Sequence, residues 1–242
     1  MAAFAENARG HQQNAAVPFA QTLLDLFGPA PLHRARSHDM GSTDQRALWA
    51  ADALHRANNL AQMASSLGSP GLRHLHGPQA DDRGAHARAL SRAYAELGTS
   101  DATDRAIPCA PLLEAIATRL VALFGAERSI RLHVAVGHVV LPAEQRRALT
   151  LIASELIINS LKYAFPAATA GLISITLGRW TDKIELSVAD NGSGLTGEKA
   201  ESGTGTTLMW KLAAMLGGEL RRFSSDSGLR VVLSMPCPAA CP

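Results

Sequence analysis

The sequence of 242 residues has no run of 18 or more apolar residues, so it offers no helix that could span a membrane. It contains three cysteines, Cys109, Cys237 and Cys241, an odd number that gives no disulfide framework and fits a reducing compartment. The start lacks a basic stretch followed by an apolar one, so no secretory signal is expected. These absences predict a cytoplasmic protein with no transmembrane sensor of its own.

The sequence also has no clear excess of positive or negative charge. Lys and Arg total 23 against 21 Asp and Glu, so the formal net charge is only +2 and gives no reason to expect a nucleic-acid partner. The nine histidines are scattered and form no H-x-x-x-H or Cys/His cluster at metal-ligating spacing. Hydrophobic residues make up 47% of the chain, enough for a core in one or two domains.

The most informative stretch is E155-L-I-I-N-S-L-K-Y-A-F165, which continues a helical pattern that begins near Pro142. Apolar residues recur along it at near-helical spacing: Leu149, Ile152, Leu156 and Leu161. Glu155, Asn159 and Lys162 fall at i, i+4 and i+7, so a carboxylate, an amide and an ammonium share one stripe. An amide oxygen suits Mg²⁺ and an ammonium suits phosphate, which predicts a metal and phosphate site here.

A second motif, D190-N-G-S-G194, follows the strand-like run 184–189. It places Asp190 at the end of the strand. Gly192 and Gly194 come directly after it, at positions where a ligand could approach the backbone closely.

Together these motifs resemble the ATP-binding boxes of the GHKL (Bergerat-fold) ATPases, the family of gyrase, the Hsp90 chaperone, histidine kinases and MutL. E155-x-x-x-N159 with the following K-Y-A-F is similar to the N box, and D190-N-G-S-G194 is similar to the G1 box. G203-T-G-T-T-L208 resembles the G2 box at the end of the ATP lid. The three motifs also have the order and spacing of the family.

The resemblance implies ATP and Mg²⁺ as ligands and a role for each motif residue. Asp190 would accept a hydrogen bond from the adenine amino group, and Asn159 would bind Mg²⁺. Glu155 would orient or polarise a phosphate-accepting histidine. The implied ATP-binding residues are Asn159, Lys162, Asp190, Gly192, Gly194, Gly203, Gly205, Thr206 and Thr207.

The G2 box departs from its usual form G-x-G-L-G-L, because Thr206 and Thr207 replace a leucine and the third glycine. The segment between Gly194 and Gly203 is also short. The short segment suggests weak or partner-dependent retention of ATP, and the altered box suggests a different closure of the lid. Together they leave room for low autokinase activity.

The N-terminal part predicts a helical hairpin over residues 44–98, preceded by a mostly disordered segment, 1–43. A first helix is expected over 44–68. A second is expected over 82–97, with Ala85, Ala89, Ala93, Tyr94 and Leu97 on its apolar seam. Two antiparallel helices cannot enclose a core alone, so we expect a homodimer with a four-helix bundle.

The first of these helices carries H55-R-A-N-N-L-A-Q62, which resembles the H-R-x-x-N-x-x-Q acceptor box of one subgroup of bacterial sensor histidine kinases. The match makes His55 the phosphate acceptor and includes Asn59 among the candidate catalytic residues. Imidazole suits this role because it is a nucleophile with a pKa near neutrality.

Residues 110–236 predict the ATP-binding domain. Helices are expected at 111–124, 142–165 and 206–216, and strands at 130–136, 172–177, 183–189, 219–224 and 228–235, with a turn over 178–182. This order predicts an α/β sandwich with helices on one face of the sheet. The fold class is therefore α+β, a dimerisation hairpin followed by a GHKL-type ATPase domain.

These features favour a histidine kinase that autophosphorylates with Mg-ATP and passes the phosphoryl group to an Asp of a response-regulator receiver domain. Any regulation would then be carried by a second protein, such as a separate sensor, or by residues 1–43. The alternative is a non-catalytic phosphorelay adaptor with a vestigial nucleotide site, which the altered G2 box favours and the intact Asn159 and Asp190 disfavour. A serine kinase of the anti-sigma type is disfavoured by the hairpin, and a gyrase- or MutL-like ATPase by the lack of a transducer domain.

Overall fold

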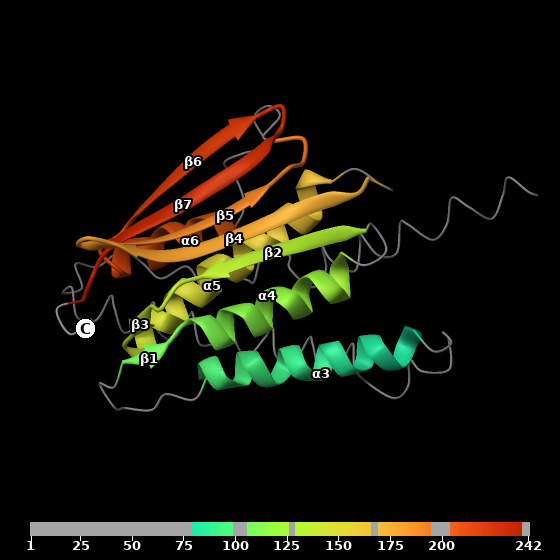
Figure 1. Cartoon of the computed structure of the whole chain (residues 1–242), viewed down its shortest axis with the longest axis horizontal. Coiled ribbons are helices and arrows are strands. Elements are labelled where there is room, and N and C mark those ends of the chain that lie inside the picture. Colours follow the sequence, from blue (N-terminus) through green and yellow to red (C-terminus); the bar gives the residue numbers. More distant parts are fainter. Residues whose placement is uncertain (1–78, 99–105, 126–128, 166–168, 195–203, 239–242) are drawn as a thin grey trace, which may run out of the picture. The chain divides into compact units, whose positions relative to one another are not determined.

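The computed structural model describes residues 79–98, 106–125, 129–165, 169–194 and 204–238, which all belong to one compact unit (Figure 1). The expectations for segment 1–43, for helix 44–68 with His55 and Asn59, and for Gly203 lie outside these residues.

Helix α5, Ala143–Asn159, is the central helix of the unit, and its side chains from Arg146 to Ile158 are all buried. Pro142 precedes its first residue, where a missing N–H costs nothing. The helical backbone continues past Asn159 as a π-helical turn, η3, Ser160–Ala164, and ends at the extended residue Phe165. The expectation of one uniform α-helix is therefore wrong in its last turn, where the wider π turn changes the stripe that Lys162 was expected to share.

The sheet has five strands in the order β2-β4-β5-β7-β6. Strand β2 is parallel to β4, and the other pairs are antiparallel. The strands are β2 Ile130–Val136, β4 Gly171–Trp180, β5 Lys183–Asp190, β6 Glu219–Ser225 and β7 Gly228–Pro236. All five were predicted, but the turn between β4 and β5 is shorter than expected, because residues 178–180 extend strand β4.

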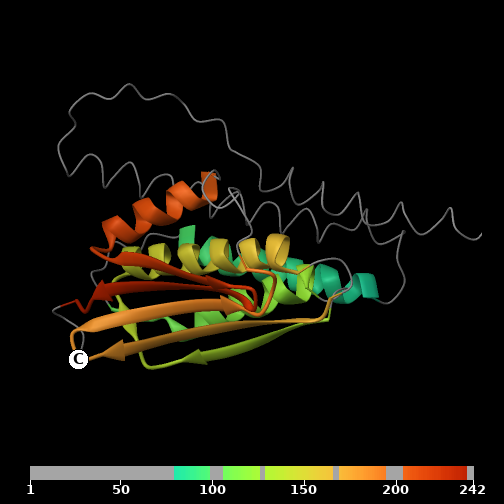
Figure 2. The same ribbon diagram turned by 90° about the horizontal axis from the view of Figure 1, so that it is seen from above.

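One face of this sheet is covered by helices α4 (Ala110–Phe124), α5 and α6 (Thr204–Met215), as Figure 2 shows. The alternation along β5 follows from this arrangement: Ile184, Leu186, Val188 and Asp190 are buried, and the residues between them are partly exposed. The predicted sandwich with helices on one face is confirmed. A small two-stranded sheet, β1 (Ile107–Pro108) with β3 (Val140–Leu141), was not predicted.

Helix α3, Gln79–Gly98, corresponds to the expected second helix of the hairpin and packs against α4. Its seam is confirmed at Ala93, Tyr94 and Leu97 but wrong at two alanines, because Ala85 is exposed and Ala89 is half-buried. The buried positions instead include Ala87 and Leu90, both fully inaccessible to solvent.

The C-terminal end of α3 is held on α5 by two neighbouring arginines. Arg147 Nε donates to the carbonyl oxygen of Leu97 at 2.5 Å, which neutralises part of the negative helix terminus. Arg146 makes a 3.1 Å ion pair with Glu96. Because both arginine side chains are largely buried, they tie α3 to α5. Within the described ranges, no helix is both long and apolar enough to cross a bilayer.

Replacing Leu90 by Ala tests the corrected seam of α3. We expect the free energy of unfolding, measured by urea denaturation, to fall by about 2–5 kcal/mol, because the substitution leaves a cavity in a packed interface. Ala85→Ser on the exposed side should change it by less than about 0.5 kcal/mol. Equal effects of the two substitutions would contradict the observed seam.

Candidate nucleotide site

Asp190, the last residue of β5, has a buried carboxylate that joins three segments. Its Oδ2 accepts a hydrogen bond from the Ser160 hydroxyl at 2.7 Å. Its Oδ1 accepts from the backbone N–H groups of Gly192 at 3.1 Å and Leu229 at 3.2 Å. The first turn of η3, the loop after β5 and the start of β7 therefore meet at this carboxylate.

These three bonds leave Asp190 with spare capacity. An ionised carboxylate offers about four acceptor positions, two on each oxygen. Both positions on Oδ1 are used, and one of the two on Oδ2 is used by Ser160. Among the described residues no further donor reaches the carboxylate, so one acceptor position on Oδ2 is left for a donor from a ligand.

The glycines of the D-N-G-S-G loop are required by close backbone contacts within the fold. A Cβ at Gly192 would overlap the carbonyl of Ala164 in η3. A Cβ at Gly194, whose φ is +66°, would overlap the carbonyl of Ser225 in β6. Ser193 N–H also donates to Ala164 O at 2.9 Å, so the loop is fixed against η3. The expected approach of these glycines to a nucleotide remains a prediction.

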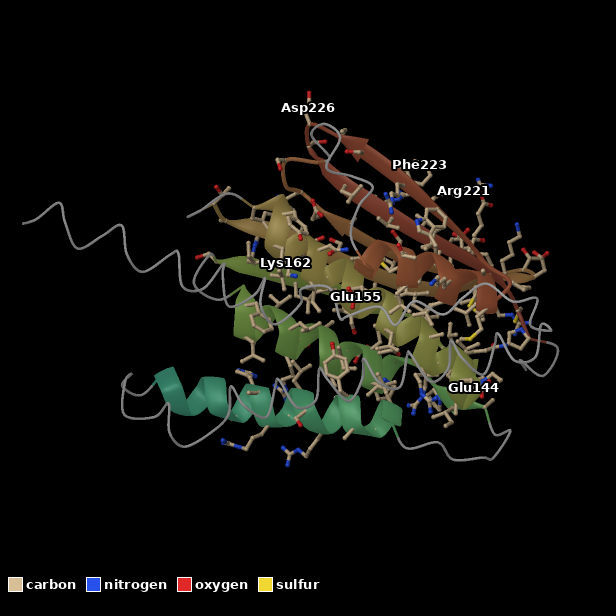
Figure 3. The ribbon with its side chains drawn as sticks, turned by 180° about the vertical axis from the view of Figure 1, so that it is seen from behind. Glu144, Glu155, Lys162, Arg221, Phe223 and Asp226 are labelled. Carbon is tan, nitrogen blue, oxygen red and sulfur yellow. The ribbon has the colours of Figure 1, made fainter. Side chains whose placement is uncertain are left out.

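Glu155, Asn159 and Lys162 lie along α5 and its π-helical continuation; Figure 3 labels Glu155 and Lys162. Glu155 is buried, with 9% of its surface exposed, whereas Asn159 and Lys162 are half-buried. Burial lowers the pKa of Lys162 below its ordinary value, and the charge of Glu155 opposes this shift. An anion beside Lys162 would stabilise its charged form and so offset the desolvation caused by burial.

Helix α6 begins within the G2 motif, at Thr204, and packs against α5, the helix that carries Glu155 and Asn159. Its first residues are Thr204, Gly205 and Thr206, and Thr207 is exposed in its first turn. The N–H groups at the start of a helix are suited to bind phosphate.

A shallow pocket of about 360 Å³ opens beside Asp190. It is lined by Asp190 and by the β6–β7 hairpin residues Phe223, Ser224, Ser225, Ser227, Gly228, Leu229 and Arg230. Its volume is within the range of small-molecule sites. Of the candidate residues it contains Asp190 alone.

A divalent ion fits the residue types present. In the part of the chain that the structure describes, no three His, Cys, Asp or Glu side chains are placed to hold a metal. Mg²⁺ needs no such cluster, since it commonly takes one or two protein oxygens and completes its shell with phosphates and water. The half-buried amide of Asn159, beside Lys162, is compatible with this mode.

Ser160 and Leu229 were missed by the sequence analysis. The signal for Ser160 was its place directly after Asn159, because a buried aspartate at a strand end needs donors and a neighbouring helix terminus can supply one. The contribution of Leu229 is a backbone N–H, which has no signature in the sequence.

Residues 144–239 match the model of the family described as histidine kinase-, DNA gyrase B- and HSP90-like ATPase. This range contains the N-box residues, Asp190 and its loop, and α6. The segment therefore has the fold of this ATPase family, and the expectation of a GHKL fold is confirmed for this part of the chain.

A sequence relative is blue-light-activated histidine kinase 2 of Erythrobacter litoralis strain HTCC2594, 26% identical over 167 residues. The match covers 66% of this chain and 48% of the relative, so the chain spans about half of that protein.

Two solved structures share the fold. The histidine kinase domain of the blue-light-activated kinase EL346 of Erythrobacter litoralis aligns with a TM-score of 0.56 at 24% identity, over 81% of this chain and 93% of that one. A structure of the EL346 kinase itself aligns with a TM-score of 0.54 at 24% identity, over 84% and 63% of the two chains.

Gly192→Ala tests the loop contact. The added methyl group meets the Ala164 carbonyl, so we expect a loss of about 1–3 kcal/mol in the free energy of unfolding, measured by chemical denaturation. Gly178→Ala in β4 is the matched control, because the nearest atom to its Cβ would be Trp180 Nε1 at 3.7 Å. A Gly192→Ala protein as stable as Gly178→Ala would contradict the close approach.

Proposed function

We propose that this chain is a protein-histidine kinase of two-component signalling. It binds Mg-ATP in residues 110–236, phosphorylates His55, and transfers the phosphoryl group to an Asp of a response-regulator receiver domain. The observation that carries the proposal is the hydrogen bond from Ser160 to Asp190. It brings the end of the Glu155 helix and the D-N-G-S-G loop together in a domain of the histidine-kinase ATPase type.

The remaining acceptor position of Asp190 supports a ligand that presents one N–H donor, as the adenine amino group does. In this proposal Asn159 contributes its amide oxygen to Mg²⁺, and Lys162 contacts phosphate. Gly203, Gly205, Thr206 and Thr207 line the phosphates from the lid and the start of α6. Binding of the polyphosphate offsets the desolvation that lowers the pKa of Lys162.

The transfer step joins an imidazole nitrogen of His55 to the γ-phosphorus, while the bond from that phosphorus to the bridging oxygen breaks and ADP leaves. Glu155 takes part by orienting or polarising His55, and Asn59, four residues after the histidine in the sequence, is the third candidate catalytic residue. Phosphoryl transfer depends mainly on positioning and charge neutralisation, which these residues and the metal supply.

The proposal includes a homodimer formed through the hairpin 44–98, and regulation by a second protein, such as a separate sensor, or by residues 1–43. It also includes the assignment of residues 55–62 to an H-R-x-x-N-x-x-Q acceptor box. Only the sequence around His55 supports this assignment.

The alternative is a phosphorelay adaptor that uses His55 without its own kinase activity. The replacement of the third G2 glycine by Thr207, which is exposed at the start of α6, favours it. The two functions differ in one respect: an adaptor gains phosphate only from another protein, whereas a kinase gains it from ATP.

Incubation with γ-³²P-ATP and Mg²⁺ tests the kinase. We expect label on the protein that is stable in alkali and lost in acid, as phosphohistidine is. His55→Gln should remove it by deleting the nucleophile, and Asn159→Ala should reduce it by about 100-fold or more by weakening metal binding.

His138→Gln, at an exposed histidine between β2 and β3, is the matched control and should leave the label unchanged. Wild-type protein that binds ATP but stays unlabelled would exclude the kinase and favour the adaptor.

Lys162→Met tests the proposed phosphate contact. Since the folded protein holds the pKa of Lys162 below its unfolded value, the charged lysine destabilises the fold at neutral pH. This loss of stability disappears as the pH rises from the pKa of Lys162 in the folded protein to its higher pKa in the unfolded chain.

We therefore expect Lys162→Met to raise stability to urea at pH 7, with a gain that shrinks at alkaline pH. ATP affinity, measured by calorimetry, should fall about tenfold or more, because a charged hydrogen bond is lost. Lys183→Met, at an exposed lysine of β5, should change neither quantity. A variant that loses stability at pH 7 or keeps full ATP affinity would count against this role.

A further inference from the structure

Strand β6 lies at one edge of the five-stranded sheet. It follows β7 in the strand order, and in the part of the chain that the structure describes no strand pairs with its outer edge (Figure 1). The backbone N–H and C=O groups along such an edge can form hydrogen bonds with a further strand. Because β6 has seven residues, Glu219–Ser225, a segment of ordinary strand length could pair with all of it.

Most side chains of β6 are accessible to solvent. Leu220 is buried and Arg222 is half-buried. The other five side chains are exposed: Glu219, Arg221, Phe223, Ser224 and Ser225. Because side chains alternate along a strand, Arg221 and Phe223 point to the face of the sheet that α4, α5 and α6 leave open, whereas Arg222 points to the face that carries α6. An added strand would therefore meet side chains on both faces.

Each face beside β6 carries an aromatic ring with an arginine over it. On the α6 side, the guanidinium carbon of Arg222 lies 5.6 Å from the ring centroid of Trp210, which is 44% exposed. On the open side, the guanidinium carbon of Arg230 in β7 lies 5.2 Å from the ring centroid of Phe223, which is 52% exposed. These cation–π contacts hold positive charge beside accessible apolar surface. Two of the four exposed large hydrophobic side chains among the described residues thus flank this strand.

The middle of β6 carries positive charge. Arg221 and Arg222 are consecutive, so one guanidinium points to each face of the sheet. The two acidic residues of the hairpin lie at its ends. Glu219 is the first residue of β6 and pairs with Arg221 at 2.9 Å, and Asp226 is in the turn before β7 (Figure 3). The centre of the strand is therefore complementary to acidic side chains.

A second copy of this chain is a poor partner for the same edge. Two β6 strands that pair antiparallel along their full length place Arg222 directly opposite its own copy. Like charges at directly opposite positions destabilise a sheet. An acidic strand in the same place instead meets both arginines with opposite charge, so charge complementarity favours an acidic segment of another protein.

We propose that β6 is a docking edge for an extended acidic segment of another protein, which adds to the sheet as a further strand. Main-chain hydrogen bonds supply affinity, and side chains supply specificity. Acidic side chains of the segment pair with Arg221 and Arg222, one on each face, and a neighbouring apolar side chain packs on Phe223. Docking at β6 uses none of the residues assigned to nucleotide binding or phosphoryl transfer, so it is independent of the proposed function.

Strand β2 at the opposite edge of the sheet is an internal comparison. Its exposed residues are Arg131, His133 and Ala135, and it contains no Phe, Tyr or Trp. An acidic strand would find one arginine there and no aromatic side chain to pack against. We therefore expect docking at β6 and not at β2.

Titration of the ¹⁵N-labelled full chain with a synthetic peptide, followed by NMR, tests the proposal. The peptide has blocked ends and about seven residues chosen from Glu, Val and Thr, with two adjacent glutamates followed by valine. We expect saturable shifts in the amide resonances of β6 and in the indole resonance of Trp210, and none in β2. The same peptide with lysine in place of glutamate should bind about tenfold or more weakly, because it meets Arg221 and Arg222 with like charge.

N-methylation of the peptide separates strand addition from attraction between charges alone. Two versions are methylated at alternate residues, one at the odd and one at the even positions, so each loses the N–H donors along one edge and keeps every side chain. We expect one version to bind about tenfold or more weakly, since its edge toward β6 has lost the donors, and the other to bind within about threefold of the parent peptide. Equal binding of the two versions overturns the proposal.

Two substitutions test the side-chain contacts on β6. Arg222→Glu and Phe223→Ala should each weaken binding of the acidic peptide by about fivefold or more, in protein whose urea midpoint shows that it is folded. Arg131→Glu, which reverses a charge at the edge formed by β2, is the matched control and should leave the affinity within about twofold of wild type. Binding that neither β6 substitution weakens, or that Arg131→Glu weakens as much, overturns the proposal.

Other occupants of the edge give different results. A wild-type dimer in light scattering that Phe223→Ala converts to a monomer would assign β6 to a second copy. A single-stranded oligouridylate that binds the same residues more tightly than the acidic peptide would assign it to nucleic acid. Either result overturns the proposal, as does the absence of any shift in β6 at about 1 mM peptide, where even weak docking is detected.

Discussion

The buried carboxylate of Asp190 is the constraint on which the site depends. A charge at the end of β5 that is 8% exposed is tolerated only if donors surround it, and the chain supplies three from separate segments. Satisfying this one group fixes the π-helical turn, the D-N-G-S-G loop and the first residues of β7 relative to one another. The positions of Asn159 and Lys162 follow, because both lie beside Ser160 on the same rigid backbone.

Helix α5 and its π-helical continuation link the Asp190 site to helix α3. Its C-terminal end meets Asp190 through Ser160, and its N-terminal half binds α3 through Arg146 and Arg147. Glu155 lies between these two ends. The helix is buried on almost all sides, so it cannot respond to α3 by a local change that leaves its other end unaffected. A single packed helix therefore connects the segment expected to belong to the hairpin with the candidate nucleotide site.

The comparison of sequence and structure shows where pattern analysis succeeds. Strands and helices with a clear hydrophobic period, such as 130–136 and 110–124, were predicted to within a few residues. Burial of one face requires apolar residues at the period of the strand or helix, so the pattern is visible in the sequence. The seam of α3 was partly misassigned because alanine occurs on both its faces, so size and polarity do not distinguish Ala85 from Ala87. The π turn after Asn159 was missed since its wider hydrogen bonding has no residue signature. The glycines of the loop were predicted to permit a close approach, but the sequence cannot show that Ala164 and Ser225 are what they approach.

The hydrogen bonds of Asp190 also bear on the choice of base under the proposed function. With two amides on Oδ1 and a hydroxyl on Oδ2, the carboxylate can take one more donor and can offer none. Adenine presents an amino group at the position where guanine presents a carbonyl oxygen. A guanine in the same orientation would place that oxygen against a buried carboxylate, leaving two acceptors in contact, which costs far more than a missing bond at the surface. The arrangement that holds the fold together at Asp190 would therefore also select the base, because the carboxylate that accepts the Ser160 hydroxyl presents only an acceptor to the ligand.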